Sequence, residues 1–114
     1  MDNFKNMWDF PVMDGISFQK ANQVHPLMQA RVEKLISHFR EDPNVKKLVL
    51  FGSSIKFSCN SCSDIDLYIE KYEKDGKLLP LPELDYEIDI ITNLPADSRL
   101  YREIDHTGLL LLER

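Results

Sequence analysis

Three aspartates stand where their carboxylates could act together. Asp64 and Asp66 lie two residues apart in the segment 64–72, whose alternation indicates a β-strand with Asp64, Asp66, Tyr68 and Glu70 on one face. Carboxylates at such spacing, about 6 to 7 Å apart at the backbone, repel each other unless a cation lies between them. Asp89, in a second alternating segment at 84–92, would complete an oxygen-ligand site for Mg²⁺ or Mn²⁺ if the two strands lie side by side.

Two alternatives to this site stay open. An isolated Asp-x-Asp pair is equally compatible with a solvated strand face. Asp85 and Glu87 fall on the same side of the expected second strand as Asp89 and could replace it as the third ligand. We favour Asp89 because its neighbours are more apolar.

A small, polar loop precedes the first aspartate. Gly52 and Ser53 follow the apolar run 45–51, which is typical of a buried strand. Glycine lets a ligand approach the backbone, and the Ser53 hydroxyl and nearby amides can donate to phosphate oxygens. Lys56 could add a positive charge in the same loop, although most lysines are simply exposed.

The remaining pattern predicts the elements that would position these residues. A helix begins at Pro26 and stops near Asp42-Pro43, because the residue before a proline avoids the helical region. A second helix over 98–105 ends near Thr107-Gly108, and the run 109–112 is a last short strand. The order predicts an α+β domain over residues 25–114, with a small mixed sheet and helices packed mainly on one side. Residues 1–24 form an irregular N-terminal arm that has room for a short helical piece.

Composition narrows the class of protein. A net charge of −5 argues against a protein that simply coats nucleic acid. No targeting segment and no apolar stretch long enough for a bilayer is visible, so the cytoplasm is the expected location. Cys59 and Cys62 are too few for a disulfide scaffold or a four-ligand zinc site, and we interpret them as incidental.

The motifs resemble a known family. The run FGS at 51–53, the run SDIDL at 63–67 and the run EIDII at 87–91 are similar to the signature of the DNA polymerase beta nucleotidyltransferase superfamily. The small size and the run TGL at 107–109 most resemble the minimal nucleotidyltransferases, which are often encoded beside a helical HEPN-type partner. The resemblance extends from about Pro26 to Arg114.

The resemblance implies a nucleotidyltransferase fold and a specific reaction. Asp64 and Asp66 would bind two Mg²⁺ or Mn²⁺ ions, and Asp89 would hold the catalytic ion and help to activate the attacking hydroxyl. Gly52 and Ser53 would contact the nucleoside triphosphate. The acceptor of the nucleoside monophosphate would be a tyrosine of the HEPN-type partner, as in a toxin–antitoxin pair. A nucleic-acid end as acceptor, and a homo-oligomeric state, stay open.

The chain also departs from the family pattern. Ser54 stands where the family often has an arginine, and Phe57 where a small residue is common. Lys56 would then supply the positive charge as a point charge rather than a planar fork. The alternative hypothesis is therefore a catalytically inactive module of the same fold that binds a nucleotide or a partner.

Overall fold

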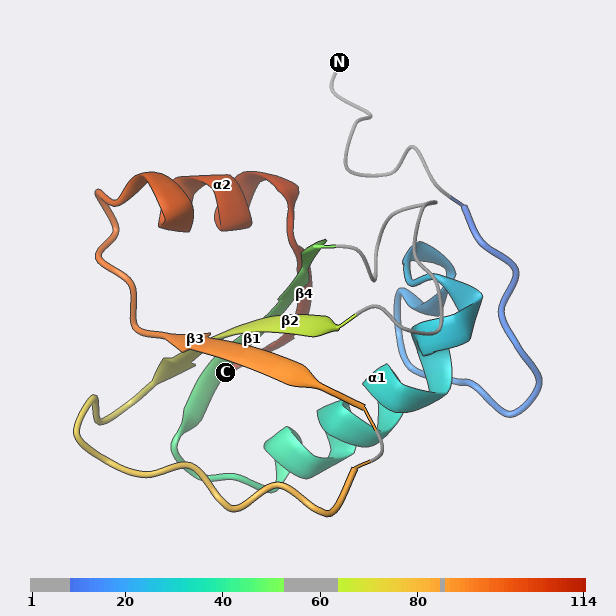
Figure 1. Cartoon of the computed structure of the whole chain (residues 1–114), viewed down its shortest axis with the longest axis horizontal. Helices are drawn as coiled ribbons and strands as arrows, with labels where there is room; N and C mark the ends of the chain where they lie inside the picture. Colours follow the sequence, from blue (N-terminus) through green and yellow to red (C-terminus); the bar gives the residue numbers. More distant parts are fainter. Residues whose placement is uncertain (1–8, 53–63, 85) are drawn as a thin grey trace.

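The computed structural model describes residues 9–52, 64–84 and 86–114, which form a four-stranded sheet and its helices (Figure 1). The elements are η2 (Ala21–Gln23), α1 (Pro26–Arg40), β1 (Val45–Phe51), β2 (Ile65–Lys71), β3 (Ile88–Thr92), α2 (Arg99–Thr107) and β4 (Leu109–Glu113). The strand order is β3-β2-β1-β4, in which β1 runs antiparallel to β2 and β4 while β2 and β3 are parallel. The expected α+β class with a mixed sheet is confirmed.

Helix α1 has well-defined signals at both ends. The backbone N–H of Leu27 donates to Nδ1 of His25, and Pro26 occupies the first helical position. At the other end, the guanidinium of Arg114 donates to the carbonyl oxygen of Phe39 at 3.0 Å and to that of Arg40 at 3.1 Å. These bonds satisfy carbonyls at a helix end that lack an intrahelical partner. One face of α1 is buried, through Met28, Gln29, Val32, Leu35, Ile36 and Phe39.

The sheet separates two apolar layers. The larger layer lies between α1 and the side chains of Leu48, Leu50, Ile65, Leu67 and Ile69. The smaller layer lies under α2 and includes Val49, Tyr68 and Ile104. We expected the helices to pack mainly on one side of the sheet. The longer helix, α1, and the larger apolar layer do lie on one side, whereas α2 covers the opposite face (Figure 1). Strands β1 and β2 carry buried apolar side chains on both faces, so each face of the sheet has to be shielded from water by a packed helix.

A buried glutamine of α1 binds the segment that precedes the helix. Gln29 is fully buried, and its Nε2 donates to the carbonyl oxygens of Pro11, Ala21 and Val24 at 2.8, 3.2 and 3.0 Å. Its Oε1 accepts the N–H of Met13 at 2.8 Å. Residues 9–24 therefore pack on the helix even though they are largely irregular.

Strand β3 is shorter than the alternating segment 84–92 predicted. Its ladder with β2 starts at the pair Ile65 and Ile88, and the carbonyl of Glu87 accepts the N–H of Ile65 at 3.1 Å. Before that point Tyr86 packs against the α1 layer, with the guanidinium of Arg31 4.7 Å from its ring centroid. Among the described residues, no helix is long and apolar enough to cross a bilayer.

Candidate functional site

Strand pairing brings two of the predicted carboxylates together. Asp66 on β2 is the register partner of Asp89 on the parallel strand β3, and Phe51 on β1 is the partner of Asp66 from the other side. Register partners share a face of the sheet. Phe51, Asp66 and Asp89 therefore form one row across three strands, and we call Asp66 and Asp89 the acidic pair. Asp66 is half-buried and Asp89 is exposed.

Gly52, which follows β1, lies in contact with the Asp66 side chain of the acidic pair. Its φ of +80° belongs to the left-handed region that favours glycine. A Cβ at this position would overlap Oδ2 of Asp66 and lie 3.2 Å from Cγ. The backbone at Gly52 thus lies directly against the Asp66 carboxylate.

The other predicted site residues are distributed differently. Asp64 is exposed and immediately precedes β2, two residues before Asp66. Glu87, a competitor of Asp89, is exposed and lies one residue before β3. The remaining residues singled out from the sequence lie outside the described part of the chain: Ser53, Ser54, Lys56, Phe57, Cys59, Cys62 and Asp85.

The donor set of the acidic pair fits a hard divalent cation. Within residues 9–52, 64–84 and 86–114, no group of three or more His, Cys, Asp or Glu side chains could hold a metal ion by itself. Mg²⁺, however, usually retains waters and is bound by one or two carboxylates together with substrate phosphates. Asp66 and Asp89, with Asp64 at the start of β2, provide such carboxylates and leave the remaining positions to phosphate and water.

Comparison of the sequence with known protein families identifies the family of the chain. Residues 33–114, well over half of the chain, match the family model described as Polymerase beta, Nucleotidyltransferase. The chain belongs to this family. The matched segment contains Gly52 and all three predicted aspartates, and nucleotidyltransferases of this family generally use divalent metals. No curated protein and no solved structure matched the chain significantly.

A buried tyrosine, Tyr68, lies two residues after Asp66 on the same face of β2. The alternation placed Tyr68 on the polar face of β2, but the structure buries it under α2, where its ring makes an edge contact with Tyr101 at a centroid distance of 5.8 Å. Its hydroxyl donates to Oε2 of Glu70 at 3.2 Å. Burial raises the pKa of the Tyr68 hydroxyl, and the charge and hydrogen bond of Glu70 raise it further. Sequence reasoning missed this because the cover comes from a distant helix.

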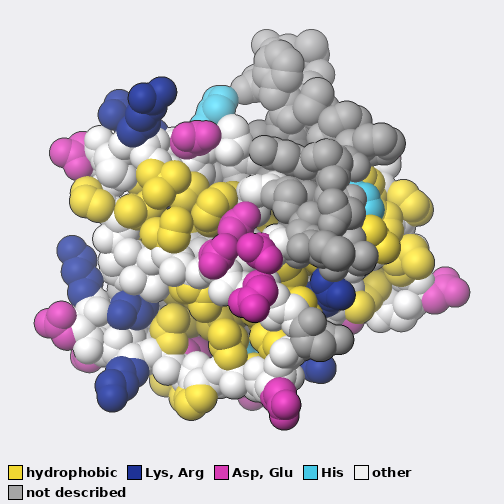
Figure 2. Space-filling model, viewed as in Figure 1, with side chains coloured by type: hydrophobic (Ala, Val, Ile, Leu, Met, Phe, Trp, Pro, Cys, Tyr) yellow, Lys and Arg dark blue, Asp and Glu magenta, His cyan; other side chains and the backbone are white. Residues whose placement is uncertain are grey.

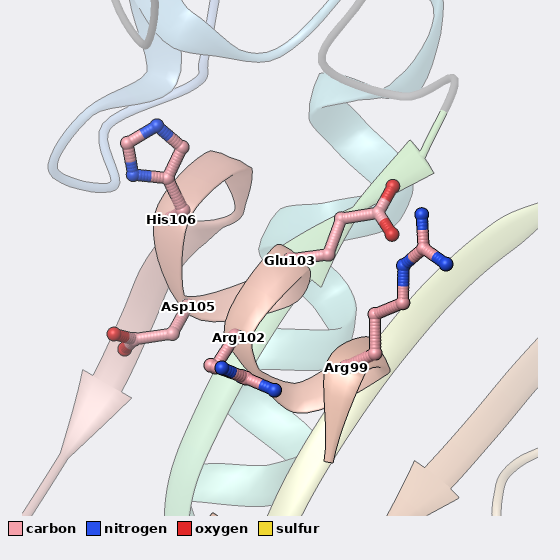
Figure 3. Close-up of a pocket in the computed structure, with 5 residues that line it drawn as sticks. All are labelled: Arg99, Arg102, Glu103, Asp105 and His106. Carbon is pink, nitrogen blue, oxygen red and sulfur yellow. The ribbon is translucent and has the colours of Figure 1, made fainter. Parts of the chain in front are cut away.

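Helix α2 borders the site and also carries a shallow depression on its outer side. Figure 3 shows the lining side chains, which all come from this one helix: Arg99, Arg102, Glu103, Asp105 and His106. Arg99 and Glu103 extend to the same side, whereas the other three point elsewhere. Figure 2 shows acidic side chains gathered near the centre of the face below α2. All five of these side chains come from one helix, whereas Asp66 and Asp89 lie on two paired strands within the segment that matches the family.

Proposed function

We propose that the protein transfers a nucleoside monophosphate from a nucleoside triphosphate to a hydroxyl group, in a reaction that depends on Mg²⁺ or Mn²⁺. The observation that carries this proposal is the register pairing of Asp66 with Asp89, with the Gly52 backbone against Asp66, inside the segment that matches the nucleotidyltransferase family. Membership of the family supports nucleotidyl transfer in general. The proposal adds the dependence on a metal ion, the nucleoside triphosphate as donor and the hydroxyl group as acceptor.

Each residue has a distinct part in the proposed reaction. Asp64 and Asp66 would hold the cation that binds the triphosphate, and the Gly52–Ser53 backbone would contact its phosphates. A bound divalent cation would neutralise charge on the phosphates and lower the pKa of the attacking hydroxyl. Asp89, the exposed member of the pair, would hold the catalytic cation and help to activate that hydroxyl, whose proton it would receive. The new bond joins the hydroxyl oxygen to the α-phosphorus, while the bond from that phosphorus to the bridging oxygen breaks and pyrophosphate leaves.

The acceptor that we propose is a tyrosine on a helical HEPN-type protein, the partner that the sequence resemblance implies. The net charge of −5 supports a protein acceptor over an extended nucleic acid, which normally needs a basic surface. A nucleic-acid end is the second acceptor to test.

The test is a transfer assay with the whole chain. The protein is incubated with Mg²⁺, each labelled nucleoside triphosphate in turn and either a helical HEPN-type protein or an oligonucleotide. We expect label on the acceptor with the wild type and at least a hundredfold less with Asp66→Asn, as for loss of a ligand to the catalytic cation. Asp75→Asn, a change at an exposed turn, is the matched control and should transfer normally. Equal transfer by Asp66→Asn would refute the proposal.

The second candidate is a nucleotide-binding module without turnover. It is favoured by Ser54 and Phe57, which stand where the family often has an arginine and a small residue. Under this function Mg²⁺ and triphosphate would raise the melting temperature, as any ligand of the native state does, but no acceptor would be labelled. The same assay, read beside a melting curve, separates the two functions.

A further inference from the structure

Strand β3 has one edge that no described strand covers. It is the last strand in the order β3-β2-β1-β4, and only β2 pairs with it (Figure 1). The N–H of Ile65 donates to the carbonyl of Glu87, and the N–H of Asn93 donates to that of Ile69. In a parallel ladder these two bonds fix which residues of β3 face β2, and every second residue faces the other way. The N–H and C=O groups that point away from the sheet belong to Ile88, Ile90 and Thr92.

We call the outward backbone groups of Ile88, Ile90 and Thr92 the open edge. Within residues 9–52, 64–84 and 86–114, no hydrogen bond reaches these groups. A strand edge of this kind is a template for pairing with another chain. Asp89, the exposed member of the acidic pair, is the second residue of the same strand. The strand that offers a pairing edge therefore also carries a carboxylate of the proposed reaction.

The row that contains the acidic pair indicates from which side an acceptor hydroxyl would approach. The row runs from Phe51 through Asp66 and ends at Asp89. A triphosphate held at Gly52 and Asp66 would occupy the part of the row next to β1. The next position beyond Asp89 belongs to whatever chain pairs with the open edge, because register partners share a face of the sheet. A hydroxyl that reaches Asp89 without displacing the triphosphate therefore comes from the side of the open edge.

We infer that the open edge binds an extended segment of the protein acceptor, which adds to the sheet beside β3 and presents its hydroxyl side chain to Asp89; this inference rests on the proposed function. Extended peptides bind exposed sheet edges through main-chain hydrogen bonds. An added strand lies about 4.8 Å from its neighbour. A serine or threonine directly opposite Asp89 would have its Cβ about 5 Å from that of Asp89, and a tyrosine would reach from the diagonal position, about 7 to 8 Å away.

Charge and length further define the acceptor segment. Glu87 and Asp89 are exposed, and Asp64 is exposed immediately before β2, whose first residue pairs with the first residue of β3. We therefore expect lysine or arginine beside the hydroxyl residue, since opposite charges across paired strands are favourable. Strand β3 has 5 residues, so a segment of similar length covers the open edge.

Two other occupants match the open edge less well. If β3 paired with β3 of a second copy over its whole length, with Ile90 opposite itself, the two Asp89 side chains would lie diagonally opposite on one face, where like charges oppose pairing. A nucleic acid has no row of amide groups for the edge, and its phosphates would meet the exposed carboxylates of Glu87 and Asp89. A peptide segment satisfies both the hydrogen bonds and the charge.

Thr92 allows the open edge to be altered without touching the acidic pair. Its side chain is exposed and its N–H points outward, so Thr92→Pro removes one donor of the open edge and no bond to β2. Thr92→Ala is the matched control, because it shortens the same side chain and keeps the N–H. The probe is a short fluorescent peptide in which valine and threonine alternate around one tyrosine, with lysines at both ends. Its binding is measured by fluorescence anisotropy in Mg²⁺ and triphosphate.

We expect the wild type and Thr92→Ala to bind the peptide equally, and Thr92→Pro to bind it about fivefold more weakly, as for the loss of one hydrogen bond. The melting-temperature rise with Mg²⁺ and triphosphate should be the same in all three proteins, which also verifies that they are folded. Peptides N-methylated at alternate amides give a second measurement that needs no variant. Methylation of the set of amides that faces β3 should abolish binding, whereas methylation of the other set should not.

The results that would overturn the inference are distinguishable from failure of the proposed function. If folded Thr92→Pro binds the peptide as tightly as Thr92→Ala, or if both methylated peptides bind equally, the peptide does not pair with β3. If the wild type binds no peptide but labels a helical HEPN-type protein, the acceptor docks elsewhere and the proposed function stands. If the wild type binds no triphosphate in Mg²⁺, the proposed function fails and the inference fails with it.

The same probe tests the other two occupants. A dimer of the wild type that the peptide dissociates, seen by sedimentation velocity, would assign the open edge to a second copy of the chain. Displacement of the peptide by an oligonucleotide that does not bind Thr92→Pro would assign it to nucleic acid. Either result would overturn the inference.

Discussion

Gly52 lies so close to Asp66 that the smallest side chain at position 52 would overlap the carboxylate. The contact joins the end of β1 to the second residue of β2, and it exists because Gly52 adopts a φ of +80°. The backbone conformation of Gly52 thus determines the space that is available to the carboxylate of Asp66.

Gly52→Ala should therefore impair ligand binding more than folding. An alanine in the left-handed region costs about 1 kcal/mol, and the overlap would in addition turn the Asp66 carboxylate away from its present position. We expect the melting-temperature rise caused by Mg²⁺ and triphosphate to disappear. Gly15→Ala is the matched control, because Gly15 has a φ of +84° but nothing within 4 Å of an added Cβ. It should lose similar stability and keep the full ligand-induced rise.

Asp89→Asn should separate binding from turnover. A group that acts chiefly on the attacking hydroxyl contributes more to the transition state than to the bound substrate. We expect measurable triphosphate binding with transfer reduced by roughly two orders of magnitude or more. Glu87→Gln is the control, since Glu87 lies before β3 and Asp89 is the register partner of Asp66. A reversal of the two effects would show that Glu87 supplies the third carboxylate.

Tyr68 should make the protein sensitive to alkaline pH. Burial raises the pKa of its hydroxyl in the folded state above the ordinary value of 10.0, with Glu70 adding to the rise. Folding then favours the protonated tyrosine, so this contribution is complete below pH 10 and is lost above it, by at most about 1.4 kcal/mol per pH unit. Urea denaturation between pH 8 and 11 should show the decline in the wild type and a flatter profile in Tyr68→Phe. Tyr72→Phe, at a residue that is 53% exposed, should keep the wild-type slope.

Gln29→Leu should release the segment before α1. The substitution leaves the carbonyls of Pro11 and Val24 and the N–H of Met13 without their buried partner. Buried polar groups without partners cost on the order of 1 to 3 kcal/mol each, so we expect a loss of about 3 kcal/mol in urea denaturation and faster limited proteolysis within residues 9–24. Gln19→Leu, at an exposed position of the same segment, should change neither measurement.

Local patterns in the sequence were enough to predict most elements and the class of fold. The proline at the start of α1 and the Asp42-Pro43 pair after it bounded the first helix within two residues. The alternation around Asp64 and Asp66 predicted β2, because side chains on a strand repeat with a period of two. The family followed from the same motifs and is confirmed by the match over residues 33–114.

Only the tertiary structure decided which residues of different strands and helices are neighbours. The register of β2 and β3 made Asp89 rather than Glu87 the neighbour of Asp66, and a shift of two residues would have been equally compatible with the alternation. Burial of Tyr68 under α2 was invisible to the sequence, because the ring that covers it, Tyr101, lies 33 positions later in the chain. Periodicity reports how side chains alternate along one element. Contacts between distant elements depend on strand order and helix placement, which a local pattern does not contain.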